Sequence, residues 1–232
     1  DVDWCSLPQR SVIGLTDHLF PSQLKEVSCP PIAIFCEGNQ KLLSQQMIAM
    51  VGSRKPTPAG LKIAEEMAAV VSSAGFTVVS GLAIGIDTVV HVGALSAFGS
   101  TIGVCATGLD RVYPKQNTEL ARDIVDKGVL ISEFPVGTPV RKHHFPRRNR
   151  MISGLAIATV VVEAVIRSGS LITAGFAADQ GREVFAVPGS VYSPVSRGPH
   201  HLIRDGACLV ESGDQILEAL GGFNSNFSNP VL

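Results

Sequence analysis

The sequence predicts an α/β fold with a mostly parallel β-sheet flanked by helices on both faces. Short runs rich in Val and Ile, such as 47–51 and 158–164, are apolar throughout rather than alternating, which is typical of strands buried on both faces. Stretches with helical periodicity separate these runs, and strand–helix alternation indicates parallel strands. Hydrophobic residues make up 45% of the 232 residues and charged residues only 17%, so we expect a packed core rather than disorder.

The predicted elements follow in a regular order from residue 47 onward. The apolar runs place strands at 47–51, 76–80, 101–106, 129–134, 158–164 and 183–187, and the periodic stretches place helices at 59–73, 86–97, 116–127 and 170–180. A small helix and strand are expected within 202–210, and a last helix at 215–220. Earlier in the chain, the run from Ile32 to Phe35 is bounded by Gly38 and Asn39, which predicts an edge strand or a leading strand of the sheet.

Composition along the chain predicts three parts. Residues 1–40 are rich in proline and irregular, and we interpret them as an N-terminal approach segment, the remnant of a small helical domain. Residues 41–220 form the α/β domain. Residues 221–232 are rich in Asn, Ser and Gly, which predicts a C-terminal tail or linker.

Several classes of protein are disfavoured. The most apolar stretch, 155–162, has eight residues, whereas a membrane span needs about 20, so we expect no membrane association and a cytoplasmic location. The five cysteines are odd in number and form no CxxC pair, which predicts neither disulfides nor a zinc site. The motifs HExxH, GxSxG and GxxxxGK[ST] are all missing from the sequence, so we expect no metal, no cofactor and no catalysis.

The positive charge is concentrated in one segment. The formal net charge of the chain is −1, but no Asp or Glu lies between Phe134 and Val162. A span of ten residues inside that segment holds five basic residues, Arg141, Lys142, Arg147, Arg148 and Arg150. A positive stripe on an otherwise acidic chain predicts a binding surface for a polyanion.

Small-residue turns follow three of the predicted strands. Gly52-Ser53-Arg54 comes after 47–51, before a helix that begins near Thr57 and Pro58, and free N–H groups at that helix end are expected to favour phosphate. The turn at 80–87 contains Asp87, which we expect to cap the next helix or to fix the loop. After 158–164 comes the turn 168–173, with Gly169, and with Ser170 and Thr173 as hydroxyl donors. We expect Glu163, which precedes this turn, to pair with an arginine.

The segment 143–150 combines basic and aromatic side chains. Phe145 offers a ring face on which a nucleobase can stack, and such stacking tolerates any base. Pro146 is expected to hold Phe145 in an extended backbone that presents its ring outward. Asn149 and Arg150 are expected to tie loops together beneath the binding surface.

Ten motifs in this order resemble those of the DNA-processing protein A (DprA/Smf) family. They include AMVGSRKPTPAG, SGLAIGID, TGLDRVYPKQN, LISEFPVGTP, HHFPRRNRMISGL, VVVEAVIRSGSLITA, GREVFAVPG and HHLIRDGA, and the resemblance covers residues 20–212. It implies an extended Rossmann-like fold and a non-catalytic protein that binds single-stranded DNA, protects incoming strands in natural transformation and helps to load the recombinase RecA.

The resemblance also implies site residues. It places the DNA pocket at Ser53, Arg54, Lys142 and Phe145, and a homodimer interface at His200, Ile203 and Leu209; many family members have Asn where this chain has His200. Together with the turns and the basic segment, the predicted nucleic-acid-binding residues are Gly52, Ser53, Arg54, Lys142, Phe145, Arg147, Arg148, Asn149, Arg150, Gly169, Ser170 and Thr173.

Two other functions remain open at this stage. The nucleoside-monophosphate phosphoribohydrolase (lysine-decarboxylase-like) enzymes have a similar layout, with a PGGxGT turn followed closely by a Glu. Here the equivalent turn is SGSLIT, and no acid follows until Asp179. The second is a protein-interaction module whose basic stripe docks an acidic partner.

Overall fold

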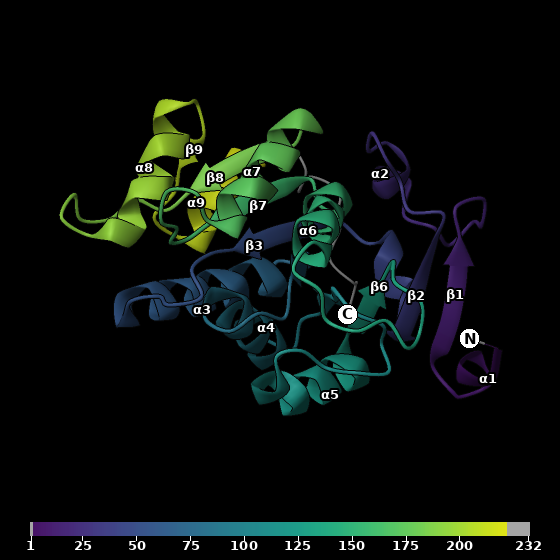
Figure 1. Cartoon of the computed structure of the whole chain (residues 1–232). Helices are drawn as coiled ribbons and strands as arrows, with labels where there is room; N and C mark the ends of the chain where they lie inside the picture. The colour runs from purple at the N-terminus through teal and green to yellow at the C-terminus, as the bar shows by residue number, and fades with distance from the viewer. Residues whose placement is uncertain (1, 222–232) are drawn as a thin grey trace, which may run out of the picture.

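Nine strands form one mixed sheet in the computed structural model, which describes residues 2–221 (Figure 1). Their order across the sheet is β1-β2-β6-β5-β4-β3-β7-β8-β9, and only the β1–β2 and β2–β6 pairs are antiparallel. The strands are β1 (Arg10–Gly14), β2 (Ala33–Gly38), β3 (Met47–Val51), β4 (Thr77–Ser80), β5 (Thr101–Val104), β6 (Val129–Ser132), β7 (Ala158–Val161), β8 (Glu183–Ala186) and β9 (Cys208–Leu209).

Helices cover both faces of this sheet, as Figure 1 shows for α6 and α7 on one side and α3, α4 and α5 on the other. The helices are α1 (Val2–Cys5), α2 (Ser22–Lys25), α3 (Pro58–Ser73), α4 (Ile86–Ser96), α5 (Thr118–Lys127), α6 (His144–Leu155), α7 (Gly169–Asp179), α8 (Arg197–Arg204) and α9 (Gly213–Ala219). Within residues 2–221, no helix is long and apolar enough to cross a bilayer. The predicted extended Rossmann-like fold class is confirmed.

The order of the strands creates a switch point between β3 and β7. From β3 the chain builds the sheet outward through β4, β5 and β6, and it then returns to the other side of β3 with β7 and β8. The connection that leaves the carboxyl end of β3 therefore runs toward the β1 edge of the sheet, and the one that leaves β7 runs toward the β9 edge. In sheets of this kind a crevice opens at that point, and ligands bind there.

Burial explains why the inner strands could be predicted. All five residues of β3 are buried, and so are all four of β7, because helices pack on both faces. One core cluster joins the sheet to α2, α6 and α7, and another joins it to α3, α4 and α9. These strands and the helices α3, α4, α5 and α7 lie where the sequence predicts them.

The N-terminal part differs from the prediction in its strands. β2, expected as an edge or leading strand, is an inner strand, because β1 pairs with it and takes the edge. Only Ile13 of β1 is buried, and Val12 is 40% exposed, so β1 carries little hydrophobic signal. The division of the chain at residue 40 stays a prediction, and nearly all of the predicted tail 221–232 lies outside the described residues.

A histidine of α4 is buried without charge inside this core. His91 is fully buried, and its Nδ1 lies 2.7 Å from the hydroxyl of Thr101, which itself donates to the carbonyl of Val78. The Nδ1 therefore carries the proton and donates it to Thr101. Burial, with a smaller contribution from the charge of Arg148, lowers the pKa of His91 to about 3.

Replacing His91 is expected to make the free energy of unfolding depend less on pH between pH 7 and pH 5. Below pH 6.5 the unfolded chain binds a proton at His91 that the folded chain excludes until about pH 3, so stability is lost as the pH falls through this window. Between pH 7 and pH 5 the wild type should lose about 2 kcal/mol more than His91→Gln, as measured by urea unfolding. Equal losses for the two proteins would contradict the buried neutral histidine.

Candidate nucleic-acid interface

A pocket of about 490 Å³ opens at the carboxyl ends of β3 and β7, at the switch point. Its wall comes from the turn after β3, from the first half of α6 and from the beginning of α7. Nine of the predicted binding residues line it, namely Gly52, Ser53, Arg54, Phe145, Arg148, Asn149, Gly169, Ser170 and Thr173. The structure thus brings together side chains from three distant stretches of sequence.

The amino end of α3 is closed to ligands, contrary to the prediction for the turn after β3. Glu163, which follows β7, accepts hydrogen bonds from the backbone N–H of Thr57 at 2.8 Å and from its hydroxyl at 2.6 Å. A Cβ at Gly60 would lie 2.4 Å from the Glu163 carboxyl carbon, so only glycine permits this approach. Glu163 therefore pairs with a helix end rather than with an arginine, because the positive end of α3 attracts the carboxylate.

The amino end of α7 remains at the pocket. Ser168 caps it by accepting from the N–H of Leu171 at 3.4 Å, and Gly169 is exposed. Two predicted hydroxyl donors are engaged inside the protein: Thr173 donates to the carbonyl of Gly169 at 3.2 Å, and the hydroxyl of Ser170 lies 2.9 Å from that of Ser168. The helix end thus presents backbone N–H groups and a positive dipole end, which favour an anion.

Phe145 and Arg54 meet at the mouth of the pocket. The Arg54 guanidinium carbon lies 5.3 Å from the centre of the Phe145 ring, a cation–π contact, and Arg54 is exposed. Phe145 is half-buried in the first turn of α6, so its backbone is helical rather than extended as predicted. Pro146 is tolerated there because the first N–H groups of a helix have no intrahelical partner.

Arg148 lines the pocket but is buried, with 3% of its surface exposed. Its Nη1 donates to the carbonyls of Gly81 and Val104, at the ends of β4 and β5. Burial lowers the pKa of Arg148 and raises the pKa of nearby Asp87, while their opposite charges oppose both shifts. Asp87 also accepts from the N–H of Ala83 at 3.4 Å, so it fixes the turn, as one of its predicted roles requires.

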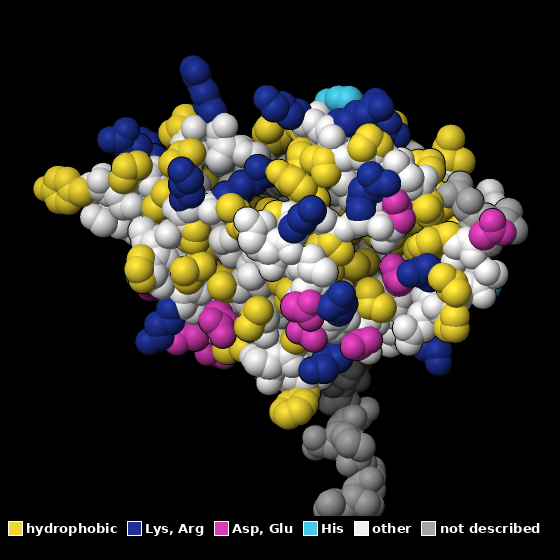
Figure 2. Space-filling model, turned by 60° about the horizontal axis from the view of Figure 1, so that its bottom comes forward, with side chains coloured by type: hydrophobic (Ala, Val, Ile, Leu, Met, Phe, Trp, Pro, Cys, Tyr) yellow, Lys and Arg dark blue, Asp and Glu magenta, His cyan; other side chains and the backbone are white. Residues whose placement is uncertain are grey.

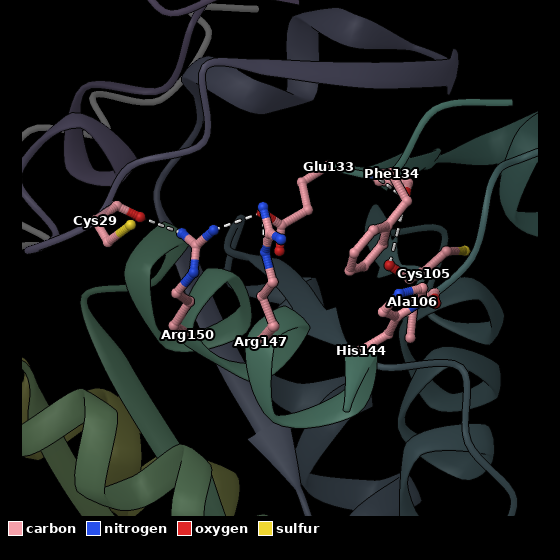
Figure 3. Close-up of polar contacts among 9 residues, drawn as sticks. Cys29, Cys105, Ala106, Glu133, Phe134, His144, Arg147 and Arg150 are labelled. Atoms are coloured by element: carbon pink, nitrogen blue, oxygen red, sulfur yellow. Dashed lines mark hydrogen bonds and ion pairs between the residues drawn. The ribbon is translucent and has the colours of Figure 1, made fainter. Parts of the chain in front are cut away.

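Two arginines of the basic stripe face away from the pocket. Arg147 and Arg150 both bind Glu133, whose side chain is 2% exposed, at 3.1 and 2.5 Å, and Arg150 also donates to the carbonyl of Cys29 (Figure 3). Neither lines the pocket, and both guanidinium groups are partly neutralised. Arg150 instead ties α6 to the N-terminal segment, so the predicted loop-tying role fits this residue.

The remaining predicted residues of the segment 142–150 also differ in role, since one holds the structure together and the other is exposed to solvent. Asn149 donates to the carbonyl of Gly169 at 3.2 Å and so joins α6 to α7. Lys142 stands in the turn before α6 with its side chain exposed, outside the pocket wall. Lys55 and Val195 line the pocket although the sequence analysis did not select them; the only signal for Lys55 was its place beside Arg54.

The surface charge is unevenly distributed. On the face in Figure 2, most Lys and Arg side chains lie in the upper half, whereas most Asp and Glu side chains lie in the lower half. Among residues 2–221, no three His, Cys, Asp or Glu side chains are grouped as a metal site would require.

The predicted dimer residues lie on helix α8 and on the edge strand β9. His200 of α8 has its Nε2 3.0 Å from the carbonyl oxygen of Gly189. Ile203 is half-buried on the same helix, and Leu209 of the edge strand β9 is 46% exposed.

The match to known proteins decides the family. A family model described as DNA recombination-mediator protein A matches residues 11–221. The chain belongs to this family. The DNA processing protein DprA of Bacillus subtilis is 41% identical over 95% of this chain and 74% of its own length, and the protein Smf of Escherichia coli is 42% identical over 94% of this chain and 58% of its own length.

Solved structures of DprA proteins share the fold. DprA from Streptococcus pneumoniae superimposes with a TM-score of 0.88 at 42% identity, over 91% of this chain and 74% of the other. DprA from Helicobacter pylori, described for its single-stranded DNA binding mode, gives 0.84 at 26% identity over 92% and 96%. A molybdenum cofactor binding protein from Rippkaea orientalis, 16% identical over 77% of this chain and 96% of its own, is similar in fold alone, with a TM-score of 0.57.

Removing the buried guanidinium should destabilise the protein strongly. Arg148→Ala leaves the carbonyls of Gly81 and Val104 without their donor, and we expect a loss of about 2–4 kcal/mol in the free energy of unfolding. Arg147→Ala is the matched control on the same helix, with its side chain 60% exposed, and should lose less than about 1 kcal/mol. Similar losses in urea unfolding would contradict the structural role of Arg148.

Proposed function

We propose that this chain binds single-stranded DNA without sequence preference, in the pocket at the switch point between β3 and β7. The observation that carries the proposal is the meeting of three features at one pocket: the exposed guanidinium of Arg54, the ring of Phe145 and the amino end of α7. A cation and a helix end attract phosphate, and an aromatic ring accepts any base. The relatives include a DNA processing protein and a DprA protein described for its single-stranded DNA binding mode, which supports the same function.

The pocket offers no reason to propose catalysis. Asp87, the one carboxylate among the described residues that line it, is held in the turn after β4, and Glu163, which stands outside this lining, caps α3. A nucleoside hydrolase needs a carboxylate that faces the substrate. We therefore propose a non-catalytic protein, and incubation with AMP separates the two functions, since release of free adenine would favour the enzyme.

We further propose that this chain acts in the cytoplasm during natural transformation, where it protects incoming strands and helps to load RecA. Kinship with the DprA proteins supports this role, because they are named for DNA processing. A pocket that binds a single strand and cleaves no bond in it would protect that strand. The test is RecA assembly on strands coated with a single-strand binding protein, which addition of this chain should accelerate.

Single substitutions in the pocket should weaken binding to a dT oligonucleotide. Phe145→Ala removes a stacking ring, and we expect about a 5- to 150-fold loss of affinity. Arg54→Ala removes a charged hydrogen-bond donor and should cause a loss of about 10- to 150-fold. Lys142→Ala, whose side chain is exposed at the turn before α6, should cause a smaller loss. Fluorescence anisotropy measures all three.

The matched control is Arg122→Ala on α5, whose exposed side chain pairs with Glu119 outside the pocket. It should bind like the wild type. The plot of log affinity against log salt concentration has a negative slope, and each lost phosphate contact reduces the magnitude of this slope by about 0.7. Arg54→Ala should therefore show a shallower slope than Phe145→Ala. Unchanged affinity in Arg54→Ala, Lys142→Ala and Phe145→Ala would contradict the pocket assignment.

We also propose a homodimer built through α8 and β9. Leu209 stands exposed on an edge strand, and an unpaired strand edge is a natural pairing site. Leu209→Glu should therefore convert a dimer to a monomer in sedimentation experiments, because it places a charge in an apolar interface. Val12→Glu, on the opposite edge strand, is the control and should leave the dimer intact; a Leu209→Glu protein that remains dimeric would contradict this interface.

A further inference from the structure

A second aromatic side chain lies beside the proposed DNA pocket, in the loop between β5 and α5. Tyr113 is 47% exposed, and its ring centre lies 5.8 Å from that of Phe145, with 56° between the ring planes. No charge pattern in the sequence indicates this residue, because the loop 105–117 carries no basic charge cluster of its own.

The pocket continues past Phe145 toward this ring. A smaller hollow of about 80 Å³ adjoins the main pocket, and Arg54, Phe145 and Arg148 line both. Tyr113 and Pro114 form part of its other wall. Because the two hollows share the side chains that separate them, they form one continuous surface from the amino end of α7 to the loop 105–117.

Phe145 alone offers limited stacking area. Arg54 stands over its ring, and Tyr113 leans against it, so the half-buried ring is already contacted by two neighbours. The tilt and the short separation leave no room for a base between the two rings. The residue Tyr113, by contrast, has nearly half of its surface open to solvent, and it lines the same hollow as the exposed Arg54.

The loop that carries Tyr113 is anchored before any ligand binds. Asn117, which is buried, donates to the carbonyl of Leu82 at 2.9 Å and to the hydroxyl of Thr88 at 3.0 Å. Asp110 accepts from the N–H of Gly137 at 2.8 Å. A ring held on such a loop loses little conformational entropy when a base stacks on it.

We propose that Tyr113 is a further nucleobase-contacting residue, so that a single strand runs from the main pocket across Phe145 onto the Tyr113 ring. This inference rests on the proposed single-strand binding. The small hollow is far below the 300 Å³ or more of ordinary ligand pockets, so it does not enclose a nucleotide. The base therefore stacks on the rim, where any of the four bases fits.

The test compares two strands of equal length, one of dT and one abasic, by fluorescence anisotropy. Tyr113→Ala should bind dT about 5- to 150-fold more weakly than the wild type does. It should bind the abasic strand with the same affinity as the wild type. Tyr113→Phe should retain the wild-type affinity for dT, because it keeps the ring. The control is Phe98→Ala, which removes a fully exposed ring just before the amino end of β5, whereas Tyr113 follows the carboxyl end of this strand; it should change neither affinity.

Each result decides the inference. Unchanged dT binding by Tyr113→Ala, or an equal loss on the abasic strand, would overturn it, since the second result means that the loop rather than the ring matters. A loss in Tyr113→Phe equal to that in Tyr113→Ala would also overturn it. A wild-type protein that binds neither strand contradicts the proposed function itself, and with it this inference, whereas an unaffected Tyr113→Ala contradicts the inference alone.

Discussion

The site depends on the hydrogen bonds that the buried guanidinium of Arg148 donates to two strand ends. This guanidinium joins α6 to the ends of β4 and β5, because one nitrogen donates to both Gly81 and Val104. A Cβ at Gly81 would lie 2.2 Å from that nitrogen, so the turn after β4 must begin with glycine. Since Phe145 stands three residues earlier on the same helix, fixing Arg148 also fixes the aromatic ring at the mouth of the pocket.

Burying this charge is unfavourable unless the surroundings compensate it. Two carbonyl oxygens and the nearby Asp87 do so, while burial still dominates the pKa shifts of both charged groups. Arg148 lines the pocket, but its Nη1 is already engaged by the two carbonyls, while its buried Nε has no hydrogen-bond partner among the described residues. Arg147 and Arg150 are likewise bound to Glu133. Within the described residues of the stripe 141–150, Arg141 and Lys142 are exposed and form no ion pair, and Arg54 and Lys55 add two exposed cations at the pocket itself.

The sequence predicted the inner sheet well, and nine of the predicted binding residues come together at one pocket, because strands and turns both depend on local patterns. β3 and β7 are apolar throughout, and small-residue turns mark where their chains leave the sheet. β1 was missed because only one of its residues, Ile13, is buried, and its pairing with β2 appears only in the folded chain.

The roles of individual charged residues could not be predicted, because they depend on partners far away in the sequence. Glu163 meets the amino end of α3, 106 residues earlier, and Glu133 meets two arginines of α6. Composition showed a basic stripe, but these contacts decide which of its cations remain free. Tyr113 escaped notice for the same reason, since it joins Phe145 only in the folded structure.

The most direct test of the account is to locate the bound strand by NMR. Titration of the ¹⁵N-labelled protein with a short dT oligonucleotide should shift the backbone amides of Ser53, Gly169 and Ser170 most strongly, because a phosphate would lie at the switch point. Shifts that instead gather around Arg147 and Arg150, or over α3 and α5, would place the strand elsewhere and contradict the account.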